Sequence, residues 1–477
     1  MNDSVDPADP VGLRPVLDPN ILRYAVLAYV VVLPIGQLLR FPVNGTVNGA
    51  VVTASDWFLG VVILAGVVEL SRMSGHYLRN RGGDLPPLPG MSTFHFAALL
   101  FMAFSAWVAL GVLWGAYPDY AVAKGLTFAA LALGALAMFW CGAEWGKVAD
   151  AWILGTVLCL CVTWVGALVG PEVVRSQVIF GSESIRGLPV PRMSGPFEYP
   201  NVFGEYLVVS AALLWARWTG VRRKWGRGAS VVAWVLAVTL LLTASSAWLA
   251  AGVLMISFGL LTIRRRQGRP TLDRKRPAPI LFLFGGVVLF TVTLAGLVVP
   301  LGVDIAGLSV AGTGLRPVIW ASAWDAVKES LIGGVGASPY LAIIADPLAP
   351  TSPVARWDAH NVYISVLGQY GVVGFVLLGG AVTVLVRTLI RGGVTRRHSM
   401  LLVALLAVGI HGISVANEEF RHVWALLGLV GLASVPDWAR GRWQRDESGA
   451  GDAPGGGAAA GATVDPTVDA TVGAREP

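Results

Sequence analysis

Long apolar stretches alternate with short polar segments along nearly the whole chain. A helix needs about 20 mostly apolar residues to cross the hydrocarbon core of a membrane. Twelve stretches approach that length, at residues 21–39, 50–70, 92–115, 121–142, 150–170, 198–216, 229–243, 245–263, 280–300, 360–386, 400–416 and 419–436. The pattern therefore predicts an all-α, polytopic membrane protein with about 12 transmembrane helices.

The basic residues predict which way these helices run. They gather in short clusters between apolar stretches, most densely at 217–228, 264–279 and 387–398. If the N-terminus is cytoplasmic, every rich cluster falls on the same side, as the positive-inside rule requires. The residues before position 21 lack the basic region of a cleaved signal, so we expect a retained first span. Both termini are then cytoplasmic.

The chain also divides by composition. We expect a polar cytoplasmic tail at 1–20, a transmembrane domain at 21–436 and a cytoplasmic tail at 437–477. The last segment is rich in Gly, Ala and Pro and has no apolar face. Such a composition buries too little apolar surface to fold, so this tail is predicted to be disordered.

Composition excludes several other classes of protein. Hydrophobic residues make up 55% of the chain and charged residues 13%, against roughly 25% charged in soluble proteins. The net charge of +6 could indicate a nucleic-acid ligand, but the basic residues follow the loops, so membrane lipids are the expected surroundings and no nucleic acid is expected. All three cysteines lie in apolar stretches, so no disulfide framework is expected.

Two long segments are predicted to lie outside, at 171–197 and 301–359. The second is the larger and precedes the tenth helix. The first carries Arg186 and Arg192 among glycines and prolines, and Pro200-Asn201 follows it. Asn201 and Glu205 are four residues apart and so share a helix face. The alternative interpretation is a helix cap with loop arginines that contact lipid head groups.

The second outside segment predicts an amphipathic helix that lies along the membrane surface. Pro317 suits a first helical position, and apolar residues recur after it at helical spacing, at Trp320, Trp324, Val327 and Leu331. Arg316 precedes this helix, at a terminus where free N–H groups and the helix dipole favour an anion. The alternative is a surface arginine beside a helix anchored by tryptophan.

His360 and Asn361 begin the tenth apolar stretch on the same outer side, and the last outside turn adds Glu418, Glu419, Arg421 and His422. Arginine binds phosphate through a bidentate fork, and a neutral histidine is the usual general base near pH 7. Asp358 is a candidate for orienting His360. The alternative is that His360 is an ordinary polar residue at a membrane boundary.

At these positions the chain resembles the O-antigen ligase and O-antigen polymerase superfamily of bacterial membrane proteins. The matching segments are "RMSGPFEYPN", "RPVIWASAWDAVKESLIGGVG" and "AHNVYISVLGQYGVVG". The resemblance implies a glycosyltransferase on the outer face of the cytoplasmic membrane that uses a polyprenyl-diphosphate-linked glycan donor, with no metal, cofactor or nucleotide sugar. The acceptor could be a hydroxyl of another glycan, of a lipid or of the cell wall.

The resemblance also implies roles for particular residues. Arg192 and Arg316 would hold the donor diphosphate, and His360 would deprotonate or position the acceptor hydroxyl. The other candidate substrate-binding residues are Arg186, Asn201 and Asn361. The chain departs from the family pattern in Ser245-Ser246-Ala247, where Ser-Arg is usual, in Gln369, where Glu is expected, and in Glu198-Tyr199.

Two other functions remain open at this point. A secondary transporter is one, although transporters place polar residues near the middle of the membrane, whereas here the ionisable residues gather at the outer helix ends. A non-catalytic accessory protein of polysaccharide export is the other, because the usual Ser-Arg is missing.

Overall fold

A computed structural model describes residues 20–42, 51–79, 91–185, 188–218, 226–243, 245–267, 278–298, 316–344, 355–391 and 395–434. Arg186 lies outside the described residues, as do the tails at 1–19 and 435–477. The chain divides into two units, 1–436 and 437–477. The predictions for both tails therefore stay predictions.

Every predicted apolar stretch overlaps a helix. These helices are α1 (Ile21–Val32), α2 (Ala54–Arg79), α3 (Met91–Leu110), α4 (Pro118–Trp140), α5 (Trp145–Val169), α7 (Pro200–Trp218), α8 (Gly226–Leu242), α9 (Ala247–Gln267), α10 (Ala278–Val298), α12 (Val362–Arg391), α13 (Arg396–His411) and α14 (Arg421–Ser434). Within the described residues, five segments are long and apolar enough to cross a membrane: Ala54–Ser71, Thr93–Leu113, Pro118–Trp140, Trp145–Val169 and Val362–Arg391. The structure is that of a polytopic membrane protein, and the number of twelve spans stays a prediction.

The segments between these helices hold more regular structure than an all-α class predicts. They contain 3-10 turns η1 (Gly36–Leu38) and η2 (Gly111–Leu113), and helices α6 (Glu172–Val178) and α11 (Arg316–Glu329). Antiparallel pairs form from β1 (Arg40–Pro42) with β2 (Val51–Thr53), β3 (Ile179–Ile185) with β4 (Leu188–Met193), and β5 (Ala342–Ile344) with β6 (Ala355–Trp357). The β3–β4 and β5–β6 hairpins both lie in segments predicted to be outside.

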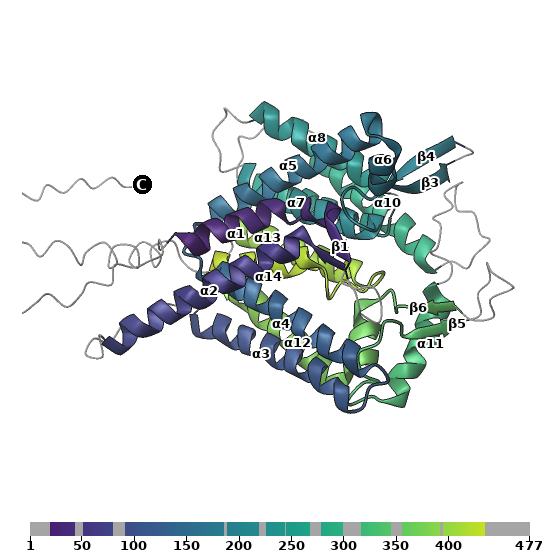
Figure 1. Ribbon diagram of the computed structural model, residues 1–477. Helices are drawn as coiled ribbons and strands as arrows, with labels where there is room; N and C mark the ends of the chain where they lie inside the picture. Colours follow the sequence, from purple (N-terminus) through teal and green to yellow (C-terminus); the bar gives the residue numbers. More distant parts are fainter. Residues whose placement is uncertain are drawn as a thin grey trace, which may run out of the picture. The chain divides into compact units, whose positions relative to one another are not determined.

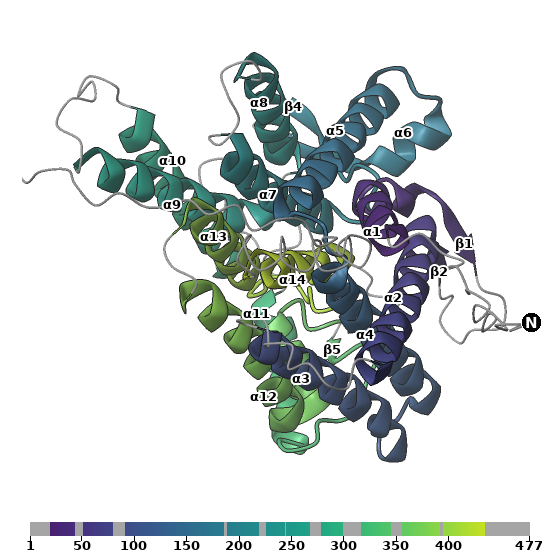
Figure 2. The same ribbon diagram turned by 90° about the vertical axis from the view of Figure 1, so that its left-hand side faces the viewer.

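The helices pack around α14, which is almost wholly buried from Trp424 to Ala433. It lies against α4, α12 and α13, while α3 packs against α4 and α12, and α13 packs against α7 and α9 (Figures 1 and 2). Helix α1 lies against α2 and α5, and α10 packs mainly against α9. Helix α14 thus forms the centre of the helical unit.

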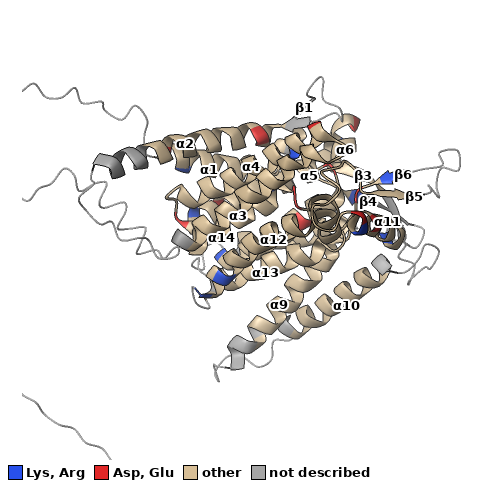
Figure 3. Ribbon diagram, turned by 90° about the horizontal axis from the view of Figure 1, so that it is seen from below, with Lys and Arg blue, Asp and Glu red and all other residues tan. Residues whose placement is uncertain are grey.

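Charged residues lie mainly at the ends of the helices (Figure 3). At one end Arg217 donates from Nε to Asp150 Oδ1 at 2.7 Å, and Arg397 lies 5.9 Å from the centre of the Trp145 ring. At the other end lie α11 and the β3–β4 and β5–β6 hairpins (Figures 1 and 3). Arg217 and Arg397 thus lie at the opposite helix end from these elements. Which end faces the cytoplasm remains a prediction.

Helix α11 is amphipathic and buries one face against the protein. Its buried residues include Ile319, Ala323 and Val327, and the first two pack in a cluster with Leu341 and Ala359. Trp324 is 43% exposed and Leu331 is 54% exposed. The small Ala323 lets the helix approach β5 closely, which turns Trp324 and Leu331 away from the protein.

The segment after α11 crosses α12 where that helix is broken. Gly371 has a φ of 66°, and a Cβ atom there would lie 2.0 Å from the Ile332 carbonyl oxygen. Val335 N donates to Gly368 O at 2.8 Å, and Val372 N donates to Leu331 O at 2.8 Å. The glycine-containing ends of two of the quoted motifs therefore pack directly on each other, which fixes α11 against the start of α12.

Candidate functional site

Arg316 is the first residue of α11 and is only 6% exposed. Its Nε and Nη1 atoms are buried and have no hydrogen-bond partner in the described part of the chain. Burial lowers its pKa to about 10, nearby Arg192 acts in the same direction, and Asp358 opposes both. The guanidinium is therefore charged at neutral pH. Because unpaired buried donors are costly, this side chain is suited to bind an anion from outside the chain.

Arg192 lies near the end of β4 and is half-buried. Its Nε atom donates to the Thr243 carbonyl at 3.3 Å, and its guanidinium lies 5.5 Å from the centre of the Phe180 ring. It is close enough to Arg316 for the two charges to disfavour each other. Two neighbouring positive charges of this kind are stabilised when an anion binds between them.

His360 is held by the residue two positions before it. Its backbone N–H donates to Asp358 Oδ1 at 2.8 Å, and its Nδ1 atom lies 2.5 Å from the same oxygen. Burial raises the pKa of Asp358, but the hydrogen bonds and charge of His360 outweigh that effect and hold it below its ordinary value. Because Nδ1 is occupied, Nε2 is the ring nitrogen that can accept a proton.

The backbone at His360 is strained. Its φ of 43° is the one positive value at a non-glycine residue among those described. Histidine tolerates this region better than most residues, but at a cost. The Trp357 ring packs edge-on at 5.8 Å between ring centres. The turn after β6 thus fixes the imidazole through strain, an aromatic contact and a carboxylate.

The two candidate asparagines make different contacts. Asn361 caps α12, because its Oδ1 atom accepts from Tyr363 N at 3.0 Å and Ile364 N at 3.1 Å. Asn201 lies in the first turn of α7, and its Oδ1 atom accepts from both N and Oγ of Ser246 at 3.2 Å. Asn361 therefore stabilises the start of its own helix, whereas Asn201 joins α7 to the start of α9.

The candidate residues come together at one end of the helices. Arg316 is within reach of the charges of both Arg192 and Asp358. The start of α12 meets the end of α13, where Val362 N donates to Gly412 O at 2.7 Å. The N-termini of α7, α9, α11 and α12 all contribute to this region, and helix N-termini favour anions. The arrangement supplies fixed positive charge beside a candidate base.

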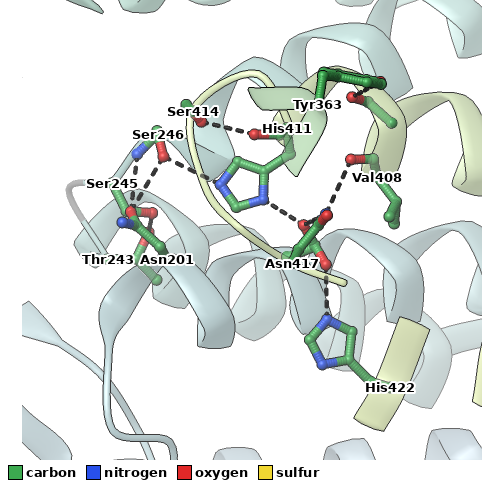
Figure 4. Close-up of polar contacts among 12 residues, drawn as sticks. Asn201, Thr243, Ser245, Ser246, Tyr363, Val408, His411, Ser414, Asn417 and His422 are labelled. Atoms are coloured by element: carbon green, nitrogen blue, oxygen red, sulfur yellow. Dashed lines mark hydrogen bonds and ion pairs between the residues drawn. The ribbon is translucent and has the colours of Figure 1, made fainter. Parts of the chain in front are cut away.

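A buried polar network lies next to these residues (Figure 4). Glu205 on α7 is fully buried; its Oε2 atom accepts from Asn417 Nδ2 at 2.9 Å and pairs with His411 Nδ1, while Oε1 lies 3.0 Å from His422 Nε2. On its other side, His411 Nε2 lies 3.1 Å from Ser246 Oγ. No group of three or more potential ligands among the described residues is arranged to hold a metal ion.

Sequence reasoning missed most of this network. The spacing of Asn201 and Glu205 predicted one face of α7, and Ser246 was singled out only as a departure from the family's Ser-Arg, while nothing singled out His411. The available signal was His411 itself, an ionisable residue near the end of the apolar stretch 400–416, because such residues in spanning segments commonly serve function.

The turn before α14 has mainly a packing role. Arg421 grips Asp56 through two hydrogen bonds, at 2.5 and 2.7 Å, and Glu419 pairs with Lys124. Glu418 accepts from Ser365 Oγ at 2.6 Å, and burial, together with Glu419, raises its pKa to about 7. These pairs tie α14 and the preceding turn to α2, α4 and α12.

One segment of the chain matches a known protein family. Residues 231–379 match a family model described as O-antigen ligase. The matched region runs from α8 to the middle of α12 and includes Ser246, Arg316, His360 and Asn361. No curated protein matches the chain. The family match and the apolar helices indicate a bacterial inner-membrane protein that acts as a glycan ligase or polymerase in polysaccharide biosynthesis. Within residues 231–379 the chain is thus similar to the O-antigen ligase family.

Proposed function

We propose that the protein transfers a glycan from a polyprenyl-diphosphate carrier to an acceptor hydroxyl on the outer face of the cytoplasmic membrane. The observation that carries this proposal is Arg316, a buried guanidinium with two unpartnered nitrogen atoms beside a second arginine. A diphosphate leaving group develops negative charge as its bond to the sugar breaks. Preorganised positive charge stabilises that change without reorganisation.

In the proposed reaction, Arg192 and Arg316 bind the diphosphate, and Asn201 and Asn361 lie at the same end to contact the substrates. The acceptor oxygen attacks the anomeric carbon of the donor glycan. The bond from that carbon to the diphosphate oxygen breaks, and the diphosphate leaves with the electron pair. The acceptor proton passes to Nε2 of His360, and Asp358 stabilises the resulting imidazolium.

Arg316→Lys tests the diphosphate role. A lysine keeps the charge but cannot form a bidentate fork. We expect donor turnover by the purified full-length protein to fall strongly, measured as release of polyprenyl diphosphate from a polyprenyl-diphosphate-linked oligosaccharide. Arg217→Lys is a matched control, because Arg217 also makes a bidentate pair but lies at the opposite helix end. Equal turnover by Arg316→Lys and wild type, at matched expression, would reject the role.

A further inference from the structure

The turn that joins α8 to α9 holds two of the residues proposed to bind the donor. Arg192 donates to the Thr243 carbonyl at 3.3 Å, and Asn201 accepts from Ser246 at 3.2 Å. These residues come from β4 and α7, which are separate elements. The hydroxyl groups of Thr243 and Ser245 bond to each other at 2.9 Å within the turn. A shift of this turn would therefore move both donor-binding side chains together.

The contact with Ser246 fixes how the Asn201 amide is turned. A backbone N–H can only donate, so the oxygen of Asn201, and not its nitrogen, must face Ser246 N. The side-chain amide N–H groups are then left for an acceptor such as a phosphate oxygen. The position of Ser246 therefore decides what Asn201 offers to a ligand.

Ser246 is in turn held from inside the protein (Figure 4). Its Oγ atom lies 3.1 Å from His411 Nε2, and the other ring nitrogen of His411 pairs with Glu205. Glu205 also contacts Asn417 and His422, so its two oxygens have partners from three side chains. A buried carboxylate with this many partners is held firmly, and it fixes which edge of the His411 ring faces Ser246.

We infer that Glu205 and His411 are positioning residues that act through Ser246 on the donor-binding site. This inference rests on the proposed function. They hold the α8–α9 turn in the place where Arg192 and Asn201 face the diphosphate. A network that served only to satisfy Glu205 would not require the second ring nitrogen of His411 to contact this turn.

Two substitutions of His411 separate these roles. Asparagine places its amide nitrogen near the position of Nδ1, so His411→Asn keeps the contact with Glu205 and loses Ser246. Glutamine reaches the position of Nε2, so His411→Gln keeps Ser246 and loses Glu205. We expect His411→Asn to weaken polyprenyl diphosphate binding by about tenfold, the value of one good hydrogen bond, and His411→Gln to weaken it less. Binding is measured on the full chain in lipid nanodiscs.

The inference would be overturned if His411→Gln bound polyprenyl diphosphate more weakly than His411→Asn. Wild-type binding by both variants would also overturn it. His398→Asn is a control, because His398 is also buried on α13 but contacts Ala433 O at 3.1 Å instead. If the His411 variants do not fold, Ser246→Ala serves as the test, and we expect it to weaken polyprenyl diphosphate binding by a similar factor. Binding within about threefold of wild type, a change well below the value of one good hydrogen bond, would reject the inference. Failure of the wild-type protein itself to bind polyprenyl diphosphate would instead reject the proposed function.

Discussion

Replacing Arg316 by methionine separates its proposed binding role from a structural one. Methionine is similar in length and can occupy an apolar site, but it lacks the charge and the N–H donors. Wild-type Arg316 leaves two buried nitrogen atoms without partners. Each unsatisfied buried donor costs about 1–3 kcal/mol, so their removal should favour the folded state.

The expected gain is smaller than this sum. Arg316 also interacts favourably with Asp358, and that attraction is lost in the variant. We therefore expect the unfolding free energy of the ligand-free protein to rise by up to about 2 kcal/mol. Polyprenyl diphosphate at 100 times its Kd should stabilise the wild-type protein by about 2.7 kcal/mol and leave Arg316→Met almost unchanged.

Thermal unfolding in detergent, with and without polyprenyl diphosphate, measures both effects. The account predicts a variant that is at least as stable as wild type without ligand and has lost the ligand-induced shift. A variant that unfolds at a lower temperature without ligand, yet keeps the full shift, would show that Arg316 serves the fold and does not bind the donor.

Three further predictions concern neighbouring positions. A Cβ atom at Gly204 would lie 2.5 Å from Ala247 Cβ, so Gly204→Ala should push the start of α9 away and weaken polyprenyl diphosphate binding in the nanodisc assay; unchanged binding would contradict the close packing. Asp358→Asn should lower kcat by about tenfold or more, the value of a hydrogen bond to a charged group; a kcat and a pH–rate profile equal to those of wild type would contradict this role of Asp358. Because the pKa of Glu418 rises from 4.5 to about 7 on folding, its contribution to stability should be complete below pH 4.5 and be lost as pH rises to about 7, by roughly 3 kcal/mol, and Glu418→Gln should remove that contribution in pH-dependent unfolding.

The positions of the helices could be predicted because the apolar stretches are a local property of the sequence. Arg192, Arg316 and His360 could be predicted as candidates because they are ionisable residues in, or directly after, long segments predicted to lie outside. The β3–β4 and β5–β6 hairpins were not predicted, because their short strands lie among glycines and prolines without a clear alternating pattern.

The polar network could not be predicted for a different reason. Glu205 and His411 are 206 residues apart in the chain, and no local pattern indicates that α7 and α13 are neighbours. The orientation of α11 likewise depends on Ala323, whose small size matters only because β5 lies against it. In both cases the missing information was the packing of distant segments.

Glycan transfer by His360→Ala tests directly whether His360 is the general base. Purified wild-type protein and the variant would be supplied with a labelled polyprenyl-diphosphate-linked glycan and membranes that contain the acceptor. The account predicts that the variant inserts and binds the donor, while transfer falls by about 10²–10⁴-fold, the usual contribution of a general base. Transfer within about threefold of wild type, far less than that loss, would contradict the assignment of His360 as the base.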